Sequence, residues 1–255
     1  HRDLHSFPTR RSSDLDPGKW LLDCCVLDLA TGRLANLTEV DRVSNYNSGL
    51  FSWPGDPESY GFTALSGGES HPFSMRLDGT DKRDLAQGSG FAYGFNASPD
   101  GKRIAYHKDY QVYLADADGG HPVKIETGNP FNFCPTWSPD GQWLLFLYGE
   151  HYDCHPFLIR RDGSELRKLA DRGVYTGVTA FLDVPDYHGG SSDTPVWSQE
   201  GTSVYYTAKV GEAIELMRVF LDGRVEQLSS SAPGVAHYHP KPSPDGRWLL
   251  FGATR

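Results

Sequence analysis

Short runs of apolar and aromatic residues recur along this chain, and each run follows the same kind of polar turn. The turn reads Ser-Pro-Asp-Gly at 98–101, 138–141 and 243–246, and Ser-Gln-Glu-Gly at 198–201. Trp53-Pro54-Gly55-Asp56 is a degenerate copy. Since turn chemistry that repeats at a fixed period indicates repeated supersecondary units, the pattern predicts an array of similar small units.

A second turn signal alternates with the first. Asp-Gly pairs lie at 78–79, 118–119, 162–163 and 222–223, and Asp28-Leu29-Ala30-Thr31-Gly32 is a looser copy. Asp-Gly between hydrophobic runs is a strong hairpin signal, because Gly tolerates positive φ and Asp bonds its own backbone. Each unit of about 40–45 residues therefore holds two hairpin turns and four strands, which is the layout of a propeller blade.

The predicted fold is all-β: an incomplete β-propeller of four-stranded antiparallel blades. Four full blades are expected at about 44–88, 91–127, 131–172 and 193–230, with half blades at about 19–40 and 236–255. They would belong to a protein of six to eight blades. A β-sandwich is the alternative, but sandwiches do not repeat their turn sequences. No window shows sustained helical spacing of apolar residues, and 28 Gly and 17 Pro interrupt the chain.

The repeat also predicts where function lies. If strands A to D run from the inside of a blade to its outside, the A–B and C–D turns share one face. The B–C connections and the D–A crossovers then share the opposite face, where sequence is free to carry function. The histidines follow this division. His71 is expected in or near the B–C region of the first full blade, His107, His151 and His155 in later B–C loops, and His188, His237 and His239 in crossovers.

One crossover is abnormally long. Gly163 and Gly201 are 38 residues apart, where other blades take 22 or 23. The extra residues fall within 173–193, a stretch that carries Tyr187, His188 and Asp193 and is rich in aromatic and acidic residues. Since long insertions in compact domains are often binding loops or lids, we expect this one to be functional; a decorative surface loop is the alternative.

The crossovers offer a candidate metal site. His237 and His239 form a His-x-His pair on the approach to an innermost strand, where residues i and i+2 share a face. His188 arrives from the neighbouring crossover. Three imidazoles would suit Zn²⁺ or Mn²⁺ with an open position for a ligand.

A second cluster lies at 150–155. Its His151, Asp153, Cys154 and His155 are all potential metal ligands. The same tight spacing could instead serve contacts with a carbohydrate or peptide through Tyr152 and hydrogen bonds. We expect an aromatic-lined polar mouth, in which rings stack on sugar rings and polar groups bond hydroxyls. Its predicted ligand-binding residues are His151, Tyr152, Asp153, His155, Tyr187, Asp193 and Lys241.

Composition narrows the function classes. A net charge of −9 argues against a nucleic-acid partner, and no stretch approaches the roughly 18 apolar residues of a membrane span. There is no Gly-x-Ser-x-Gly elbow, P-loop or dinucleotide fingerprint.

Cys24 and Cys25 are neighbours on one predicted strand and should not pair with each other. Residues 1–15 resemble a translated sequencing adapter, so we assign 16–255 to the partial propeller and expect a gene fragment open at both ends.

The Ser-Pro-Asp-Gly repeat with its Asp-Gly partner, over about residues 19–255, resembles the TolB family of WD-like propellers. That resemblance implies three functions. TolB is a periplasmic scaffold, so a binding module for a polymeric or protein ligand, periplasmic or secreted, is the primary expectation. The metal-dependent oligogalacturonate lyases are the second, with His188, His237 and His239 as Mn²⁺ ligands, although Gly234 stands where those enzymes carry a Gln. The gating propeller of prolyl-oligopeptidase-type peptidases is the third.

Overall fold

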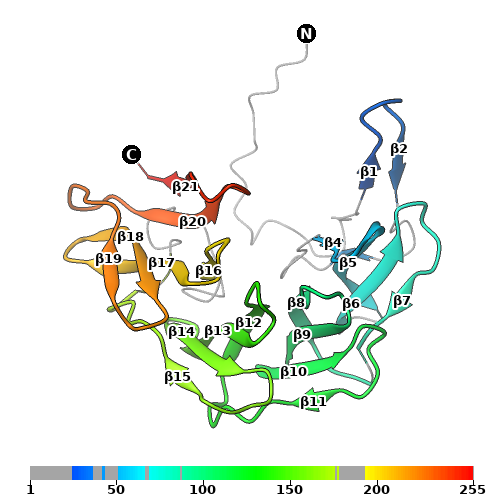
Figure 1. Cartoon of the computed structure of the whole chain (residues 1–255), viewed down its shortest axis with the longest axis horizontal. Helices are drawn as coiled ribbons and strands as arrows, with labels where there is room; N and C mark the ends of the chain where they lie inside the picture. Colours follow the sequence, from blue (N-terminus) through cyan, green and yellow to red (C-terminus); the bar gives the residue numbers. More distant parts are fainter. Residues whose placement is uncertain are drawn as a thin grey trace.

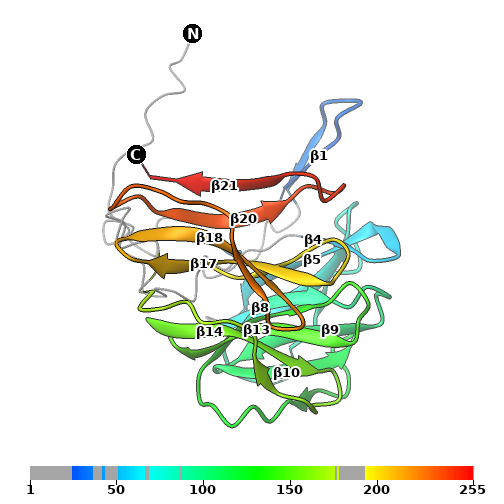
Figure 2. The same ribbon diagram turned by 60° about the vertical axis from the view of Figure 1, so that its left-hand side comes forward.

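The computed structural model describes residues 25–36, 42–43, 51–66, 69–86, 88–175, 177 and 193–254. These residues form strands, turns and loops, and their strands group into six antiparallel sheets. The sheets stand side by side in an arc (Figure 1), and Figure 2 shows them turned partly edge-on. The predicted all-β, incomplete propeller is therefore confirmed.

Three blades have the predicted four strands in the order A-B-C-D. Blade 2 consists of β8 (Ala92–Ala97), β9 (Arg103–Lys108), β10 (Gln111–Asp116) and β11 (Val123–Lys124). Blade 3 consists of β12 (Asn132–Trp137), β13 (Trp143–Glu150), β14 (Asp153–Arg160) and β15 (Arg167–Lys168). Blade 4 consists of β16 (Val196–Trp197), β17 (Ser203–Val210), β18 (Ala213–Phe220) and β19 (Val225–Gln227).

Blade 1 has a divided inner strand. Both β3 (Arg42–Val43) and β4 (Phe51–Trp53) pair with β5 (Asp56–Ser66), which continues to β6 (Glu69–Arg76) and β7 (Arg83–Asp84). The two half blades lie at the ends of the arc (Figure 1). They are β1 (Cys25–Leu27) with β2 (Leu34–Asn36), and β20 (His237–Pro242) with β21 (Leu249–Ala253).

Local hydrogen bonds explain the Ser-Pro-Asp-Gly repeat. In blade 2, Ser98 Oγ donates to Asp100 Oδ1 at 2.6 Å and accepts from the Arg103 backbone N–H at 3.0 Å. Gly101 takes φ of 68°, which favours glycine. Ser138 and Ser243 make the same two bonds in their own turns. Each turn thus closes its hairpin with its own side chains.

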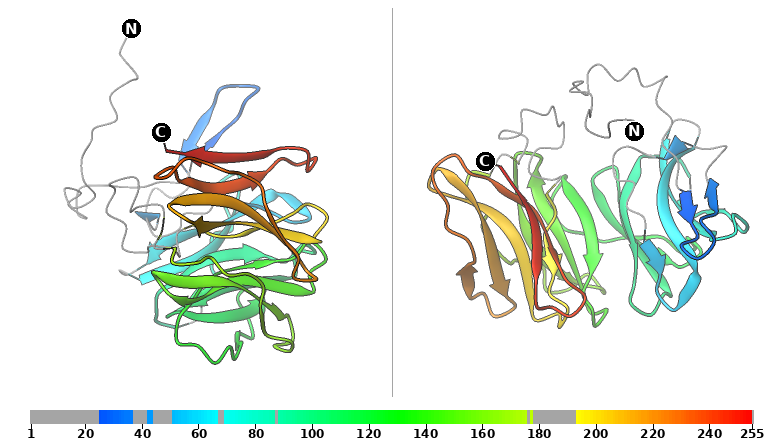
Figure 3. Two further views of the ribbon diagram at one scale, coloured as in Figure 1. Left: turned by 90° about the vertical axis from the view of Figure 1, so that its left-hand side faces the viewer. Right: turned by 90° about the horizontal axis from the view of Figure 1, so that it is seen from above.

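The same motif also packs from blade to blade. A Cβ added to Gly141 would lie 3.6 Å from Cδ of Pro99, and one added to Gly201 would lie 3.1 Å from Cδ of Pro139. The proline of one turn therefore covers the glycine of the next blade's turn. These contacts pack the A–B turns of blades 2, 3 and 4 against one another. Figure 3 shows the arc of blades from two further sides.

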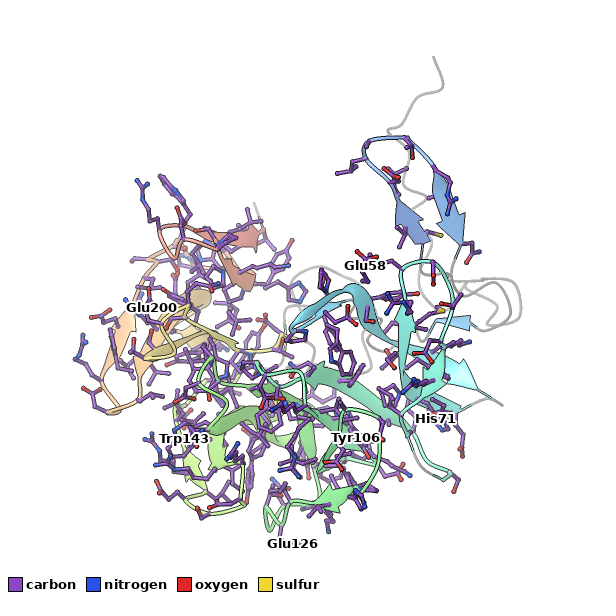
Figure 4. The ribbon with its side chains drawn as sticks, turned by 45° about the vertical axis from the view of Figure 1, so that its right-hand side comes forward. Glu58, His71, Tyr106, Glu126, Trp143 and Glu200 are labelled. Carbon is purple, nitrogen blue, oxygen red and sulfur yellow. The ribbon has the colours of Figure 1, made fainter. Side chains whose placement is uncertain are left out.

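The hydrophobic core lies between neighbouring sheets. Leu144 and Phe146 of blade 3 are fully buried against Ala105 and Val112 of blade 2. Tyr106 and Trp143, labelled in Figure 4, belong to the layers between blades 1 and 2 and between blades 3 and 4, respectively. In the end sheet, Trp248 and Leu250 are instead 69% and 74% exposed, since no described sheet lies beyond β21.

The assignment of His107 and His155 to B–C loops was wrong. His107 lies in β9, where it is fully buried, and His155 lies in β14, whereas His71 lies near the start of β6, close to the B–C connection as expected. The reason is that the B–C connections of blades 2, 3 and 4 have only two residues, so the strands continue up to the turn. Among the histidines assigned there, His151 does lie in the turn. We call the side with the A–B and C–D turns the turn face, and the opposite side the crossover face.

Acid is expected to loosen these turns. The Ser98 hydroxyl lowers the pKa of Asp100, and hydroxyl bonds from Ser243 and Thr80 likewise lower the pKa of Asp245 and Asp78. Because the folded pKa lies below the unfolded one, this stability is present above about pH 4 and is lost as the pH falls through the folded pKa. The urea midpoint should therefore drop between about pH 7 and pH 3, less steeply in Asp100→Asn. An equal drop in that variant would contradict the assignment to Asp100.

Candidate functional site

The crossover face carries an aromatic cluster between blades 2 and 3, which we call the aromatic rim. It consists of Tyr110, Phe131, Phe133, His151 and Tyr152. The ring of Tyr110 lies 5.3 Å from that of Phe131, 5.6 Å from that of Phe133 and 5.6 Å from that of His151. The Phe133 and His151 rings are 4.7 Å apart. These spacings are typical of edge-to-face and tilted aromatic pairs, so the rings support one another as one unit.

Short connections hold the rim in place. Tyr110 is the second residue of the β9–β10 turn, where Asp109 and Tyr110 both have positive φ, of 49° and 63°. Its carbonyl accepts hydrogen bonds from Asn132 Nδ2 at 3.0 Å and from the Asn132 backbone N–H at 2.9 Å. Gln111 Nε2 donates to the Pro130 carbonyl at 2.8 Å. The turn of blade 2 is thus tied to the crossover that carries Phe131.

The predicted cluster at 150–155 divides between two surroundings. His151 joins the rim, and the Tyr152 side chain beside it is 53% exposed. His155 lies on β14, where its Nδ1 accepts from the Arg172 backbone N–H at 3.2 Å. The carboxylate of the exposed Asp153 lies 3.3 Å from His155 Nε2. Burial lowers the pKa of His155. His151 and Tyr152 therefore lie at the aromatic rim, while His155 supports the neighbouring crossover.

Asp193 belongs to a buried polar network and not to an open mouth. Its Oδ2 accepts hydrogen bonds from the Tyr175 hydroxyl at 2.8 Å and from the Thr207 hydroxyl. Arg172 Nη2 lies 3.5 Å from the same oxygen, and Arg172 Nε donates to the Thr207 carbonyl at 2.9 Å. All four residues are at most 2% exposed, and burial raises the pKa of Tyr175. The network joins the crossover after blade 3 to β17.

The His-x-His pair is split by a bulge in β20. The register shifts between Tyr238 and Lys241, and His239 takes φ of 51°. The His239 backbone N–H donates to Asp193 Oδ1 at 2.9 Å. The buried His237 directs its Nδ1 to Ser229 Oγ at 3.0 Å and Glu215 Oε2 at 3.3 Å. The expectation that the two imidazoles share one face assumed a regular β-strand. Because β20 is irregular at these residues, that expectation stays a prediction. Lys241 is exposed beyond the bulge.

The metal site stays a prediction. His188, its third residue, and Tyr187 of the predicted mouth both lie outside the described residues. Among the residues that the structure describes, no group of three or more His, Cys, Asp or Glu side chains could hold a metal ion.

The cysteines form no disulfide within the described ranges. Cys25, Cys134 and Cys154 lie there without one, and Cys24 lies outside those ranges. Within those same ranges, no helix has the length and apolarity needed to cross a bilayer.

Several residues of the site were missed from the sequence. Tyr110, Phe131 and Phe133 form most of the rim, and Arg172 lies at the centre of the buried network. One signal was available: Tyr110 and Tyr152 occupy the same position in the two-residue turns of neighbouring blades. Aligning the repeats would have paired these two tyrosines. Arg172 left no such signal, because its burial depends on three separate segments.

Comparison with known proteins supports the fold. No family model matches the chain. An uncharacterized peptidase, YuxL, of Bacillus subtilis is 25% identical over 205 residues, which are 62% of this chain and 28% of the relative. The uncharacterized protein Atu1656 of Agrobacterium fabrum is 29% identical over 163 residues, 60% of this chain and 48% of the relative. The chain thus spans less than half the length of either relative.

Solved structures point to the same propeller type. TolB from Acinetobacter baumannii aligns with a TM-score of 0.60 at 20% identity, over 83% of this chain and 49% of that one. A protein described as a TolB from Agrobacterium tumefaciens aligns with 0.56 at 19% identity, over 91% and 88% of the two chains. A prolyl endopeptidase aligns with 0.51 at 12% identity, over 79% and 31%. A manganese-bound oligogalacturonate lyase reaches only 0.44, which carries no argument.

Proposed function

We propose that this chain, which folds as a TolB-like propeller, is a binding or scaffold module that recognises a polymeric or protein ligand through its aromatic rim. One observation carries the proposal. Tyr110 and Tyr152 come from equivalent turns of adjacent blades, and both are open to solvent, at 36% and 53% exposure. The rings of Phe131, Phe133 and His151 contact the ring of Tyr110, and Tyr152 follows His151 in the same turn.

The geometry of the rim suits an extended ligand. Its tyrosines stand on two-residue turns of adjacent blades, and both are partly exposed to solvent. Tyrosine in this setting contributes contact area at low entropic cost and keeps a polar tip for hydrogen bonding. A sugar chain or an extended peptide can contact both blades at once. A periplasmic or secreted location is part of the proposal and follows from the likeness to TolB.

Removing the two tyrosines is expected to weaken ligand binding strongly. We expect Tyr110→Ala with Tyr152→Ala to weaken retention of the ligand by about a hundredfold, since aromatic anchors at the centre of an interface often contribute 2 kcal/mol or more. The probes are uronate, chitin and cellulose oligosaccharides and the soluble proteins of the source cell's periplasm, each tested on immobilised wild-type and variant protein. Phe220→Ala, an aromatic change on the turn side of β18, is the matched control.

The outcomes are distinct. A probe retained by the wild type and the control but not by the double variant supports the rim as the binding surface. Equal retention by all three proteins contradicts it. Failure of every probe to bind the wild type overturns the binding-module proposal for these ligand classes.

A second candidate function is the gating propeller of a peptidase. The observation in its favour is the likeness to the peptidase YuxL over 62% of this chain, together with the prolyl endopeptidase fold match. In this proposal the propeller would restrict access to a hydrolase domain carried by the same protein. Sequencing the coding region on both sides of this segment tests it. A Gly-x-Ser-x-Gly hydrolase domain in frame would support the proposal, and its absence from the complete gene would reject it.

A further inference from the structure

Two acidic residues stand beside the aromatic rim, at the end of the β13–β14 hairpin. Glu150 ends β13 and Asp153 begins β14, so they enclose the turn of His151 and Tyr152, and their Cα atoms are direct cross-strand partners. Both residues are exposed. Since like charges at directly opposed positions of a hairpin repel each other, this end of blade 3 holds its negative charge at a cost to the turn.

The repeat does not require acids at these positions. The pairs that flank the B–C connection in the other blades are Ser66 with Glu69, Lys108 with Gln111, and Val210 with Ala213. Among the described pairs at this position of the repeat, Glu150 with Asp153 alone joins two acids. The blade that combines them is also the one that contributes a turn with an imidazole and a tyrosine to the rim.

Both acids lie on the face of blade 3 that is turned to blade 2. Successive residues of a strand alternate between the two faces of the sheet. Phe146 and Tyr148 pack into the hydrophobic cluster between blades 2 and 3, so Glu150, two residues further along β13, belongs to the same face. Asp153 shares that face as the cross-strand partner of Glu150. The negative charge is therefore placed on the side of blade 3 where Tyr110 of blade 2 meets the rim.

The hairpin does not neutralise this charge by itself. Glu150 makes no hydrogen bond or ion pair with the part of the chain that the structure describes. Asp153 Oδ1 lies 3.3 Å from His155 Nε2, but burial lowers the pKa of His155, so this imidazole is uncharged at neutral pH. Because His155 Nδ1 accepts from the Arg172 backbone N–H, Nε2 carries the single proton and donates it to Asp153 without adding charge.

Neighbouring lysines are held away from the two acids. Lys168, on the adjacent β15, places its Nζ 2.6 Å from Asp171 Oδ2. Lys108 runs against the crossover that enters blade 2, where its Cε lies 2.4 Å from the position that a Cβ on Gly90 would take. The rim thus combines exposed aromatic rings with a net negative charge, which a positively charged ligand group would neutralise.

We infer that the aromatic rim takes a lysine or arginine side chain from an extended segment of a protein partner. This inference rests on the proposed function, in which the rim is the binding surface, and narrows its ligand. Tyr110 and Tyr152 are partly exposed, and a cation within about 6 Å of an aromatic ring centroid is attracted by the ring. Glu150 and Asp153 supply the opposite charge, which guides the cation to the rim and selects it over other groups.

Two other occupants match the rim less well. A polyuronate or another acidic polymer would be repelled by the two carboxylates. A hard metal ion needs several converging oxygen ligands and gains nothing from tyrosine rings. No group of three or more His, Cys, Asp or Glu side chains within the described ranges could hold such an ion.

Three labelled peptides test the charge selectivity. Peptides of four Gly-Lys-Ser, Gly-Gln-Ser or Gly-Glu-Ser repeats are titrated with the protein at pH 8, where imidazoles are ordinarily neutral, and binding is followed by fluorescence anisotropy. We expect the lysine peptide to bind about tenfold more tightly than the other two. Glu150→Gln with Asp153→Asn should remove this preference, because two exposed ion pairs are lost. Raising sodium chloride from about 0.05 M to about 0.5 M should weaken the preference of the wild type in the same way.

The whole chain is acidic, with a formal net charge of −9, so the test needs a charge-matched control. Glu58→Gln with Glu200→Gln removes the same charge near the A–B turns, on the opposite face (both residues are labelled in Figure 4). This variant should keep the preference for lysine. Glu150→Lys with Asp153→Lys should reverse it in favour of the glutamate peptide. The urea midpoint of Glu150→Gln should be unchanged or slightly raised, which reports an intact fold and relief of the like-charge pair.

The outcomes separate this inference from the proposed function. Weaker lysine-peptide binding in Tyr110→Ala with Tyr152→Ala and in Glu150→Gln with Asp153→Asn, but not in the control, supports the inference. Equally tight binding of the glutamine peptide or of cellohexaose, if it still needs the two tyrosines, overturns the selectivity and leaves the rim as the binding surface. Equal weakening by the control, or no binding of any peptide, also overturns the inference. Lysine-peptide binding that survives loss of both tyrosines overturns it as well and contradicts the proposed function of the rim.

Discussion

Replacing Asp193 with Leu is expected to lower the free energy of unfolding by about 3–5 kcal/mol, because it leaves the buried Arg172 guanidinium without its carboxylate. The pair is 3.5 Å apart, and both side chains are at most 1% exposed. The change also removes the acceptor for the Tyr175 and Thr207 hydroxyls. Urea unfolding followed by tryptophan fluorescence measures the effect.

An exposed ion pair of the same crossover provides the control. Lys168 Nζ lies 2.6 Å from Asp171 Oδ2, but the two side chains are 40% and 65% exposed. Lys168→Ala is therefore expected to cost no more than about 1 kcal/mol, since solvent screens such pairs. The double variant Arg172→Met with Asp193→Leu should recover much of the loss, because no charge is left buried alone. A cost below about 1 kcal/mol for Asp193→Leu would show that the network does not join the blades.

Gly119→Ala is expected to be the most damaging of the Asp-Gly turn substitutions, at about 2–5 kcal/mol. Gly119 has φ of 81°, and a Cβ there would lie 2.3 Å from the backbone carbonyl oxygen of Leu85 in the neighbouring blade. The positive φ costs a non-glycine residue about 1–2 kcal/mol, and forcing two blades apart adds about 1–3 kcal/mol.

Two glycines of the same motif separate these contributions. Gly163 and Gly223 have φ of 86° and 91°, and a Cβ at either would meet nothing within 4 Å. Gly163→Ala and Gly223→Ala should therefore show the conformational cost alone, about 1–2 kcal/mol. The difference in unfolding free energy from Gly119→Ala isolates the contact between blades 1 and 2. Equal costs at all three positions would rule that contact out.

The aromatic rim arises directly from the repeat. It uses Tyr110 and Tyr152, which occupy one repeated position, the second residue of the two-residue B–C turn, in two adjacent blades.

Much of the fold could be predicted from local signals. Ser98 and Asp100 close an A–B turn with bonds inside one hexapeptide, and Asp118-Gly119 closes a C–D turn within four residues. Such bonds need no distant partner, so each turn can be recognised wherever its letters occur. The alternation of these turns then determined the number and order of strands in blades 2, 3 and 4.

The site could be predicted only in part. His151 and Tyr152 were identified because they lie in a turn rich in polar and aromatic residues. His107 and His155 were misplaced, because the length of a B–C connection is decided by strand pairing and not by composition. The shared face of His237 and His239 was expected from a regular strand, and β20 has a register shift between Tyr238 and Lys241, so that expectation stays a prediction.

The sequence by itself determined the turn chemistry, the four-stranded blade and the division into two faces, since all of these depend on residues close together in the chain. Only the tertiary structure decided that Asp193 is a buried partner of Arg172 and that the rings of Tyr110 and His151 meet. Those arrangements join segments from different blades. Their geometry follows from how the sheets pack against one another, which no local pattern encodes.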